Sequence, residues 1–138
     1  KELCFKAAEK GTMLRLIPED YYSEELILLV FKNGKHQPDI NDVPSEFVTE
    51  TLLGEYVKIG KGLWLDKACK ENGIDKLQVL KHVIYSGIQY LDNIFGNHFS
   101  KEIVGYAFSV YKNHEDWSTY VQKYKVKFER QELNEYLF

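Results

Sequence analysis

The sequence predicts an all-α protein: a single compact domain over residues 1–138, with six or seven helices packed around a long central helix near residues 76–95. Three observations favour this fold. Apolar residues recur at helical spacing in several segments. Capping residues precede those segments. No two segments alternate in the way that paired strands require. With 138 residues, of which 44% are hydrophobic, the chain is long enough to bury a core without disulfides.

The first two helices are predicted from their ends. Residues 2–10 form a short helix that Gly11 terminates. Ser23 is a typical N-cap, followed by acids that suit the positive end of the helix dipole, and Asn33-Gly34 supplies the stop. A buried strand over residues 26–31 is the alternative. The segment that would pair with it, residues 35–40, is polar and contains a proline, so we favour a helix.

The next helices lead to the predicted central one. Pro44-Ser45-Glu46 is read as the start of a helix, and a short helix over residues 63–71 ends at Asn72-Gly73. Asp75 then caps the long helix, which ends at Gly96. That helix is apolar over most of its circumference, which is typical of a helix surrounded by others, and we expect Leu80 and Ile84 at the centre of the core.

The C-terminal third contains two further helical segments. Ser100 caps a helix over residues 101–113, and Asp116 caps a last segment over residues 117–138. The spacing of its apolar residues slips after Phe128, so this segment is either one helix kinked near Glu129 or two helices. No internal repeat, linker or low-complexity tract is predicted.

Residue types that carry catalytic or metal chemistry form no recognisable motif. The histidines lack the i, i+4 spacing of a helical zinc site, and the glycines do not form a phosphate-binding loop. Cys4 and Cys69 are most simply small hydrophobic residues. We therefore expect no catalytic residue, no metal and no cofactor. An enzyme that uses His98 or His114, which flank one predicted helix, is the third of three hypotheses.

The distribution of charge points to a protein partner. Residues 19–55 carry nine acids against two lysines, whereas residues 117–130 carry four basic residues against one acid. Ten tyrosines exceed the needs of a core, and the adjacent Tyr21 and Tyr22 lie within an acidic stretch. Adjacent helical residues point about 100° apart, so one of these rings is expected at the surface, and we expect Tyr22 to anchor the partner. Tyrosines beside acids are typical of a surface that binds a basic protein.

The predicted partner-binding face has two parts, and their proximity is an assumption at this point. The face comprises Glu19, Asp20, Tyr21, Tyr22, Glu24 and Glu25, together with Asp39, Asp42, Glu46 and Glu50. The basic segment from Lys123 to Arg130 is the next candidate.

In size, in its lack of catalytic motifs and in the acidic, tyrosine-bearing Glu19–Glu55 region, the chain resembles the small helical immunity proteins of bacterial contact-dependent growth-inhibition systems. That resemblance implies a non-enzymatic cytoplasmic protein that neutralises a basic partner, such as a nuclease toxin. Two cysteines and the lack of a signal peptide or a long apolar run fit a cytoplasmic protein without a membrane partner.

The second hypothesis is a helix-turn-helix regulator that reads DNA. Residues 64–88 are predicted as helix, turn and helix, and the second helix would offer residues 76–82 to a groove. The net charge of −3 argues against nucleic acid, because a duplex requires several phosphate contacts. The oligomeric state is not predicted.

Overall fold

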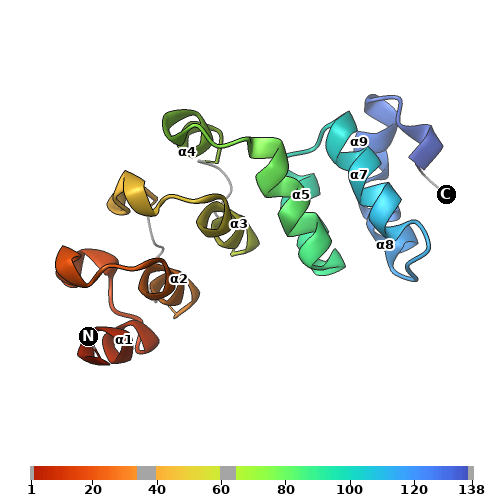
Figure 1. Ribbon diagram of the computed structural model, residues 1–138. Coiled ribbons are helices and arrows are strands. Elements are labelled where there is room, and N and C mark those ends of the chain that lie inside the picture. Colours follow the sequence, from red (N-terminus) through yellow and green to blue (C-terminus); the bar gives the residue numbers. More distant parts are fainter. Residues whose placement is uncertain (1, 34–39, 60–64, 137–138) are drawn as a thin grey trace. The chain divides into compact units, whose positions relative to one another are not determined.

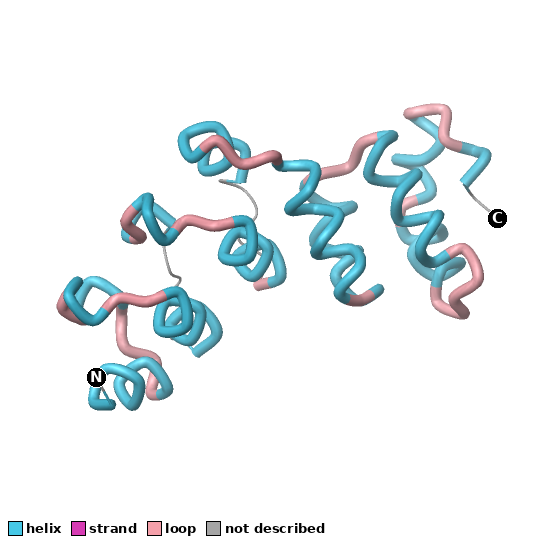
Figure 2. The backbone as a smooth tube through the Cα atoms, viewed as in Figure 1, coloured by secondary structure: helices cyan, strands magenta, loops and turns pink. Residues whose placement is uncertain are grey.

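A computed structural model describes residues 2–33, 40–59 and 65–136 (Figure 1), and every regular element within these ranges is a helix (Figure 2). The predicted all-α class is therefore confirmed for this part of the chain, and residues 26–31 are helical rather than a strand. The described ranges contain nine α-helices instead of six or seven, joined by short 3-10 helices.

The helices form two compact units, residues 1–75 (unit 1) and residues 76–138 (unit 2). In unit 1, helix α1 packs on α2, and α2 packs on α3; in unit 2, helix α5 packs on α7 and α8 adjoins α9. A single domain over residues 1–138 stays a prediction. The α-helices of unit 1 are α1 (Glu2–Glu9), α2 (Glu24–Asn33), α3 (Glu50–Lys58) and α4 (Leu65–Asn72). Those of unit 2 are α5 (Lys76–Ser86), α6 (Leu91–Asn97), α7 (Lys101–Tyr111), α8 (Trp117–Lys123) and α9 (Lys125–Arg130).

Unit 1 contains an internal repeat, contrary to the expectation from the sequence. Two 3-10 helices precede α2, and two others precede α3: η1 (Leu14–Leu16) and η2 (Glu19–Tyr21), then η3 (Ile40–Asp42) and η4 (Ser45–Phe47). Each element of the second set begins 26 residues after its counterpart. In chain order the pattern continues, because α6 begins 26 residues after α4, and α7 begins 25 residues after α5.

The repeat is also a repeat of buried positions. Leu26 in α2 and Leu52 in α3 are both 0% exposed, and the three following core positions of each helix are buried as well. Those pairs are Ile27 and Leu53, Val30 and Tyr56, and Phe31 and Val57. Each 26-residue segment therefore presents the same apolar face to its neighbours, as repeat proteins do.

Several predicted helix ends are confirmed. The backbone N–H of Leu26 donates to Ser23 Oγ (3.1 Å), and that of Ile103 donates to Ser100 Oγ (3.3 Å). Gly11 and Gly73 have φ of 89° and 65°, a left-handed conformation that glycine adopts without strain after a helix.

Two predicted starts need correction. Pro44 directly precedes the 3-10 helix η4, and the N-cap of α3 is Thr49, whose hydroxyl accepts from the N–H of Leu52 (3.1 Å). Asp116 makes no capping hydrogen bond through its side chain at the start of α8; its own N–H donates to His114 Nδ1 (3.0 Å).

The predicted long central helix is interrupted. Helix α5 ends at Ser86, Gly87 is extended, a 3-10 helix η6 (Ile88–Tyr90) follows, and α6 begins at Leu91. A prediction of one helix near residues 76–95 was thus too long. Leu80 and Ile84 are nevertheless buried, as expected, at 2% and 0% exposure.

The C-terminal segment has one more break than predicted. Helix α8 ends at Lys123, α9 begins at Lys125, and a 3-10 helix, η7 (Asn134–Tyr136), follows. A break that the sequence did not predict thus lies at Tyr124, whose hydroxyl donates to Asp92 of α6. The predicted break near Glu129 is present as well, because α9 ends at Arg130 before η7.

Candidate protein-binding surface

The structure assigns different roles to the two adjacent tyrosines. The hydroxyl of Tyr22 donates to the carbonyl oxygen of Leu14 (2.9 Å), and its ring meets that of Phe47 edge-on, with centroids 6.3 Å apart. Tyr22 thus connects η1 to η4 and belongs to the packing of unit 1. Tyr21 is 47% exposed, so the ring at the surface is that of Tyr21, and the expectation of Tyr22 as the anchor for a partner was wrong.

Electrostatics place Asp42 in the same region as the first acidic cluster. Burial raises the pKa of the Tyr22 hydroxyl, and the negative charges of Glu19 and Asp42 raise it further. A carboxylate influences a hydroxyl in this way only at short range. Asp42 from the second part of the predicted face therefore lies near Tyr22 from the first part.

A direct contact also joins the two parts of the predicted face. The hydroxyl of Thr49 donates to Glu24 Oε1 (3.2 Å), so the start of α2 lies beside the start of α3. Glu50 follows Thr49 directly, and Glu46 adjoins Phe47, which contacts Tyr22. The assumed proximity of the two clusters is thereby supported for the residues that the structure describes, whereas Asp39 lies outside them.

The repeat explains why these acids lie on one surface. Glu24 and Glu50 are the first residues of α2 and α3, and Asp20 and Glu46 are the middle residues of η2 and η4. Equivalent positions in adjacent repeats line the same face. We call this surface the acidic face; its exposed residues are Glu19, Asp20, Tyr21, Glu24, Glu25, Asp42, Glu46 and Glu50.

A cavity of about 200 Å³ opens in unit 1, between the 3-10 helices η3 and η4 and helix α4. Buried apolar side chains, among them Val43, Val48 and Ala68, form part of its lining. The charged residues that line it are Lys67 and Glu71, whose side chains approach to 3.9 Å.

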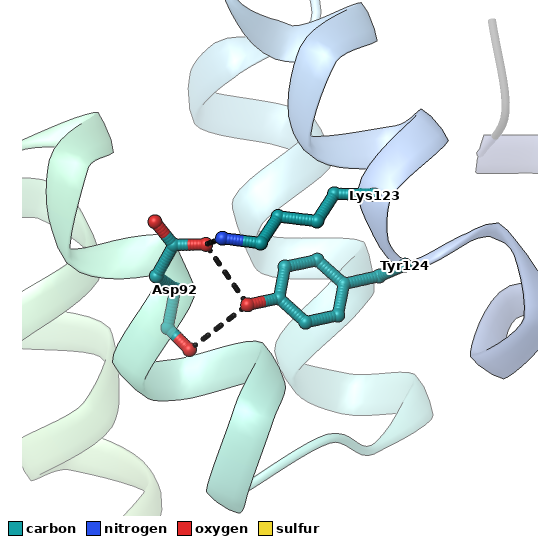
Figure 3. Close-up of polar contacts among 3 residues, drawn as sticks. All are labelled: Asp92, Lys123 and Tyr124. Carbon is teal, nitrogen blue, oxygen red and sulfur yellow. Dashed lines mark hydrogen bonds and ion pairs between the residues drawn. The ribbon is translucent and has the colours of Figure 1, made fainter.

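The basic segment from Lys123 to Arg130, the other predicted candidate, has structural contacts instead. Lys123 Nζ lies 2.7 Å from Asp92 Oδ1, and the hydroxyl of Tyr124 donates to the same oxygen (2.9 Å), as Figure 3 shows. Lys127 Nζ donates to the carbonyl oxygens of Phe95 (2.8 Å) and Gly96 (3.2 Å), close to the C-terminal end of α6. These contacts fasten α8 and α9 to α6.

The contacts of Asp92 shift the ionisation of the groups involved. Burial favours the neutral acid, but hydrogen bonds from Lys123 and Tyr124 and the charge of Lys123 outweigh it, so the pKa of Asp92 is lowered. Burial and the hydrogen bond to the Asp92 carboxylate raise the pKa of Tyr124 to about 12. The ionised form of Asp92 is therefore the one that holds the segment in place.

We expect Asp92→Asn to reduce the acid dependence of stability. Because the pKa of Asp92 is lower in the folded protein than in the unfolded chain, its contribution is fully present above the ordinary pKa of 3.8 and is lost as the pH falls through the folded value. Urea unfolding at several pH values, from neutral to acidic, measures this contribution as the difference in free energy of unfolding between the parent and the variant. That difference should shrink at acidic pH; a constant difference would contradict the assignment.

Other chemistry is sparse in the described ranges. There, no three His, Cys, Asp or Glu side chains are placed to hold a metal ion, and neither cysteine is disulfide-bonded. No helix in these ranges has both the length and the apolar character needed to cross a bilayer. For the helix-turn-helix hypothesis, α4 and α5 flank the turn at Gly73, and Lys81 of α5 lies over the ring of Tyr106 (5.4 Å from the centroid). DNA binding stays a prediction.

Comparison of the chain with protein-family models, with curated proteins and with solved structures finds no match.

Proposed function

We propose that this protein is a non-catalytic binding module that neutralises a basic protein partner through the acidic face. One observation carries the proposal: two consecutive repeats place exposed acids at equivalent positions, beside the exposed ring of Tyr21, and the Thr49–Glu24 hydrogen bond joins them. The acids attract a basic surface over distance, and the ring supplies rigid apolar area at contact.

We further propose that the partner is a nuclease toxin. The resemblance to immunity proteins of contact-dependent growth-inhibition systems supports a nuclease toxin as partner and the cytoplasm as the place of binding. A nuclease fits because a surface that binds nucleic acid is rich in lysine and arginine, and such a surface is complementary to the acidic face. Co-expression with the toxin encoded beside this gene tests the assignment: growth should depend on this protein, and toxicity that persists would contradict it.

Reversing charges on the acidic face should slow association with the partner. Asp20→Lys with Glu46→Lys changes equivalent positions of the two repeats. We expect the association rate at low ionic strength to fall about 10-fold or more, with a smaller difference in salt, because screening weakens electrostatic steering. Surface plasmon resonance against a basic partner captured from the source cells measures the rate.

A matched control separates the location of the charges from their number. Glu115→Lys with Glu135→Lys makes the same change in net charge at exposed positions of unit 2. This control should associate at a rate close to that of the parent. If both double variants associate equally slowly, net charge alone governs the encounter and the acidic face is not the binding site.

Replacing Tyr21 should act on dissociation. Its ring is 47% exposed and so available to a partner. A tyrosine anchor that a partner buries contributes about 2 kcal/mol or more to the free energy of binding. We therefore expect the complex of Tyr21→Ala to dissociate roughly 30-fold faster. Tyr22→Ala is unsuitable for this purpose, because it removes the hydrogen bond to Leu14 and the contact with Phe47 inside unit 1. A dissociation rate unchanged by Tyr21→Ala, with an unchanged melting temperature, would place the anchor elsewhere.

A further inference from the structure

Unit 2 contains an open groove of about 430 Å³, and its lining includes none of the residues that fasten α8 and α9 to α6. Helices α5 and α7 form its sides, and η7 contributes one residue. Its lining consists of Leu77, Lys81, Lys101, Glu102, Gly105, Tyr106 and Tyr136. The absence of a side chain at Gly105 shapes it, because a Cβ atom there would lie only 3.3 Å from the hydroxyl oxygen of Tyr136.

The charge of the groove contrasts with that of the acidic face. Glu24 and Glu50 begin α2 and α3 in unit 1, whereas lysine begins α5 and α7 in unit 2. A positive charge at the first position of a helix is unfavourable, because the helix dipole is positive at that end. The stability of α7 therefore does not explain why a lysine, Lys101, stands at its first position, where it lines the groove. Departures of this kind are expected at functional positions.

Aromatic side chains accompany the lysines. Lys81 Nζ lies over the ring of Tyr106, 5.4 Å from its centroid, which holds the ammonium group at the groove. Tyr85, one helical turn after Lys81 on α5, is 74% exposed. The groove thus offers positive charge and apolar ring surface side by side.

We infer that this groove binds an acidic peptide segment of a partner protein, one that carries an aromatic or large aliphatic side chain between its carboxylates. The carboxylates pair with Lys81 and Lys101, and the apolar side chain packs on Leu77 and Tyr106. This surface is distinct from the acidic face and takes a partner of the opposite charge. Because the two surfaces lie in different units, the inference does not depend on the proposed function.

The charges favour a peptide over single-stranded nucleic acid. A nucleic acid strand presents one phosphate per nucleotide and binds along a continuous row of basic and aromatic side chains. Two lysines line this groove, and Glu102 beside Lys101 repels a continuous polyanion. Lys123 and Lys127 do not extend the row, because they are bonded to Asp92 and to backbone carbonyl oxygens. A peptide whose carboxylates are separated by an apolar residue can pair with the two lysines without placing a negative charge beside Glu102.

The test uses the full chain and a fluorescein-labelled eight-residue peptide that alternates aspartate with phenylalanine. Fluorescence anisotropy should show binding at low salt, and no comparable binding of a peptide with asparagine in place of aspartate. Lys81→Glu with Lys101→Glu should weaken binding about 10-fold or more, with the loss reduced in salt. Tyr106→Ala should weaken binding at every salt concentration, and Tyr106→Phe, which keeps the ring, should bind like the parent.

A matched control has the same net charge as the groove variant. Lys112→Glu with Lys125→Glu changes two exposed lysines of unit 2 that do not line the groove, and it should bind the peptide like the parent. Equal weakening of both double variants would overturn the inference, as would equal binding of the asparagine peptide. Tighter binding of oligothymidylate, lost in the groove variant, would assign the groove to nucleic acid. Self-association that the groove variant abolishes would assign it to a second copy of the chain.

Discussion

Phe95→Ala is expected to lower the free energy of unfolding by about 3–5 kcal/mol, the range for removal of a buried phenylalanine ring. Phe95 is 0% exposed and lies at the centre of the aromatic core of unit 2. Four rings meet it edge-on, and their centroids lie between 5.5 and 6.4 Å from that of Phe95: Phe99 (5.5 Å), Trp117 (6.4 Å), Tyr124 (5.6 Å) and Phe128 (5.9 Å). Edge-to-face pairs add about 0.5–1.5 kcal/mol each beyond the burial of area.

Urea denaturation followed by circular dichroism measures the loss, and Phe95→Leu tests its origin. Leucine keeps most of the apolar contact but removes the ring–ring geometry, so it should lie between the parent and the alanine variant. Tyr85→Ala, at a ring that is 74% exposed, is the control and should change stability by no more than about 0.5 kcal/mol. If Phe95→Ala unfolded at the same urea concentration as this control, Phe95 would not be at the centre of the core.

Local signals in the sequence predicted the start of a helix correctly where one side chain caps it. Ser23 and Ser100 cap their helices because a hydroxyl one residue before a helix reaches its exposed N–H groups, whatever the rest of the fold. Thr49 has the same chemistry, but Pro44-Ser45-Glu46 carries an equally strong start signal five residues earlier. That signal belongs to η4, a separate short helix, and a pattern of residue types does not distinguish it from the first turn of α3.

The interruption at Gly87 shows what periodicity alone misses. The apolar rows of α5 continue through Ile88 and Leu91, so the spacing favours one helix. Glycine weakens a helix, and in this chain Gly87 is extended while Ser86 Oγ donates to the carbonyl oxygen of His82 at the last turn of α5. The break lets Asp92 and Phe95 on α6 meet the side chains of α8 and α9, a tertiary requirement that no local pattern contains.

The repeat is hard to see in the sequence because burial recurs more often than residue identity: Leu26 matches Leu52, but the other three core pairs differ. The pairs Ile27 and Leu53, Val30 and Tyr56, and Phe31 and Val57 share burial but not residue type. Within the candidate site, the sequence predicted the acids because charge clusters are visible without a structure. It favoured Tyr22 as the anchor, because the contacts of Tyr22 with Leu14 and Phe47, which approach from other elements, are not visible in a local pattern.

The repeat leads to a second large effect on stability, in unit 1. Leu26→Ala and Leu52→Ala change equivalent positions, each 0% exposed. Each variant should have a free energy of unfolding lower by about 2–5 kcal/mol, because apolar burial is lost and a cavity is left behind. Leu3→Ala is the matched control, because Leu3 on α1 is 79% exposed and its removal leaves no cavity. Urea denaturation of the three variants provides the comparison.

The sizes of the two losses test whether the repeats have equivalent cores. Since α2 packs directly on α3, the double variant Leu26→Ala with Leu52→Ala should deviate from the sum of the single losses, as neighbouring core positions do. Single losses that are both large would support a shared 26-residue building unit. One leucine variant could instead lose much free energy of unfolding while the other loses no more than Leu3→Ala. In that case the repeat would concern only where the helices begin and end, and the two cores would not be equivalent.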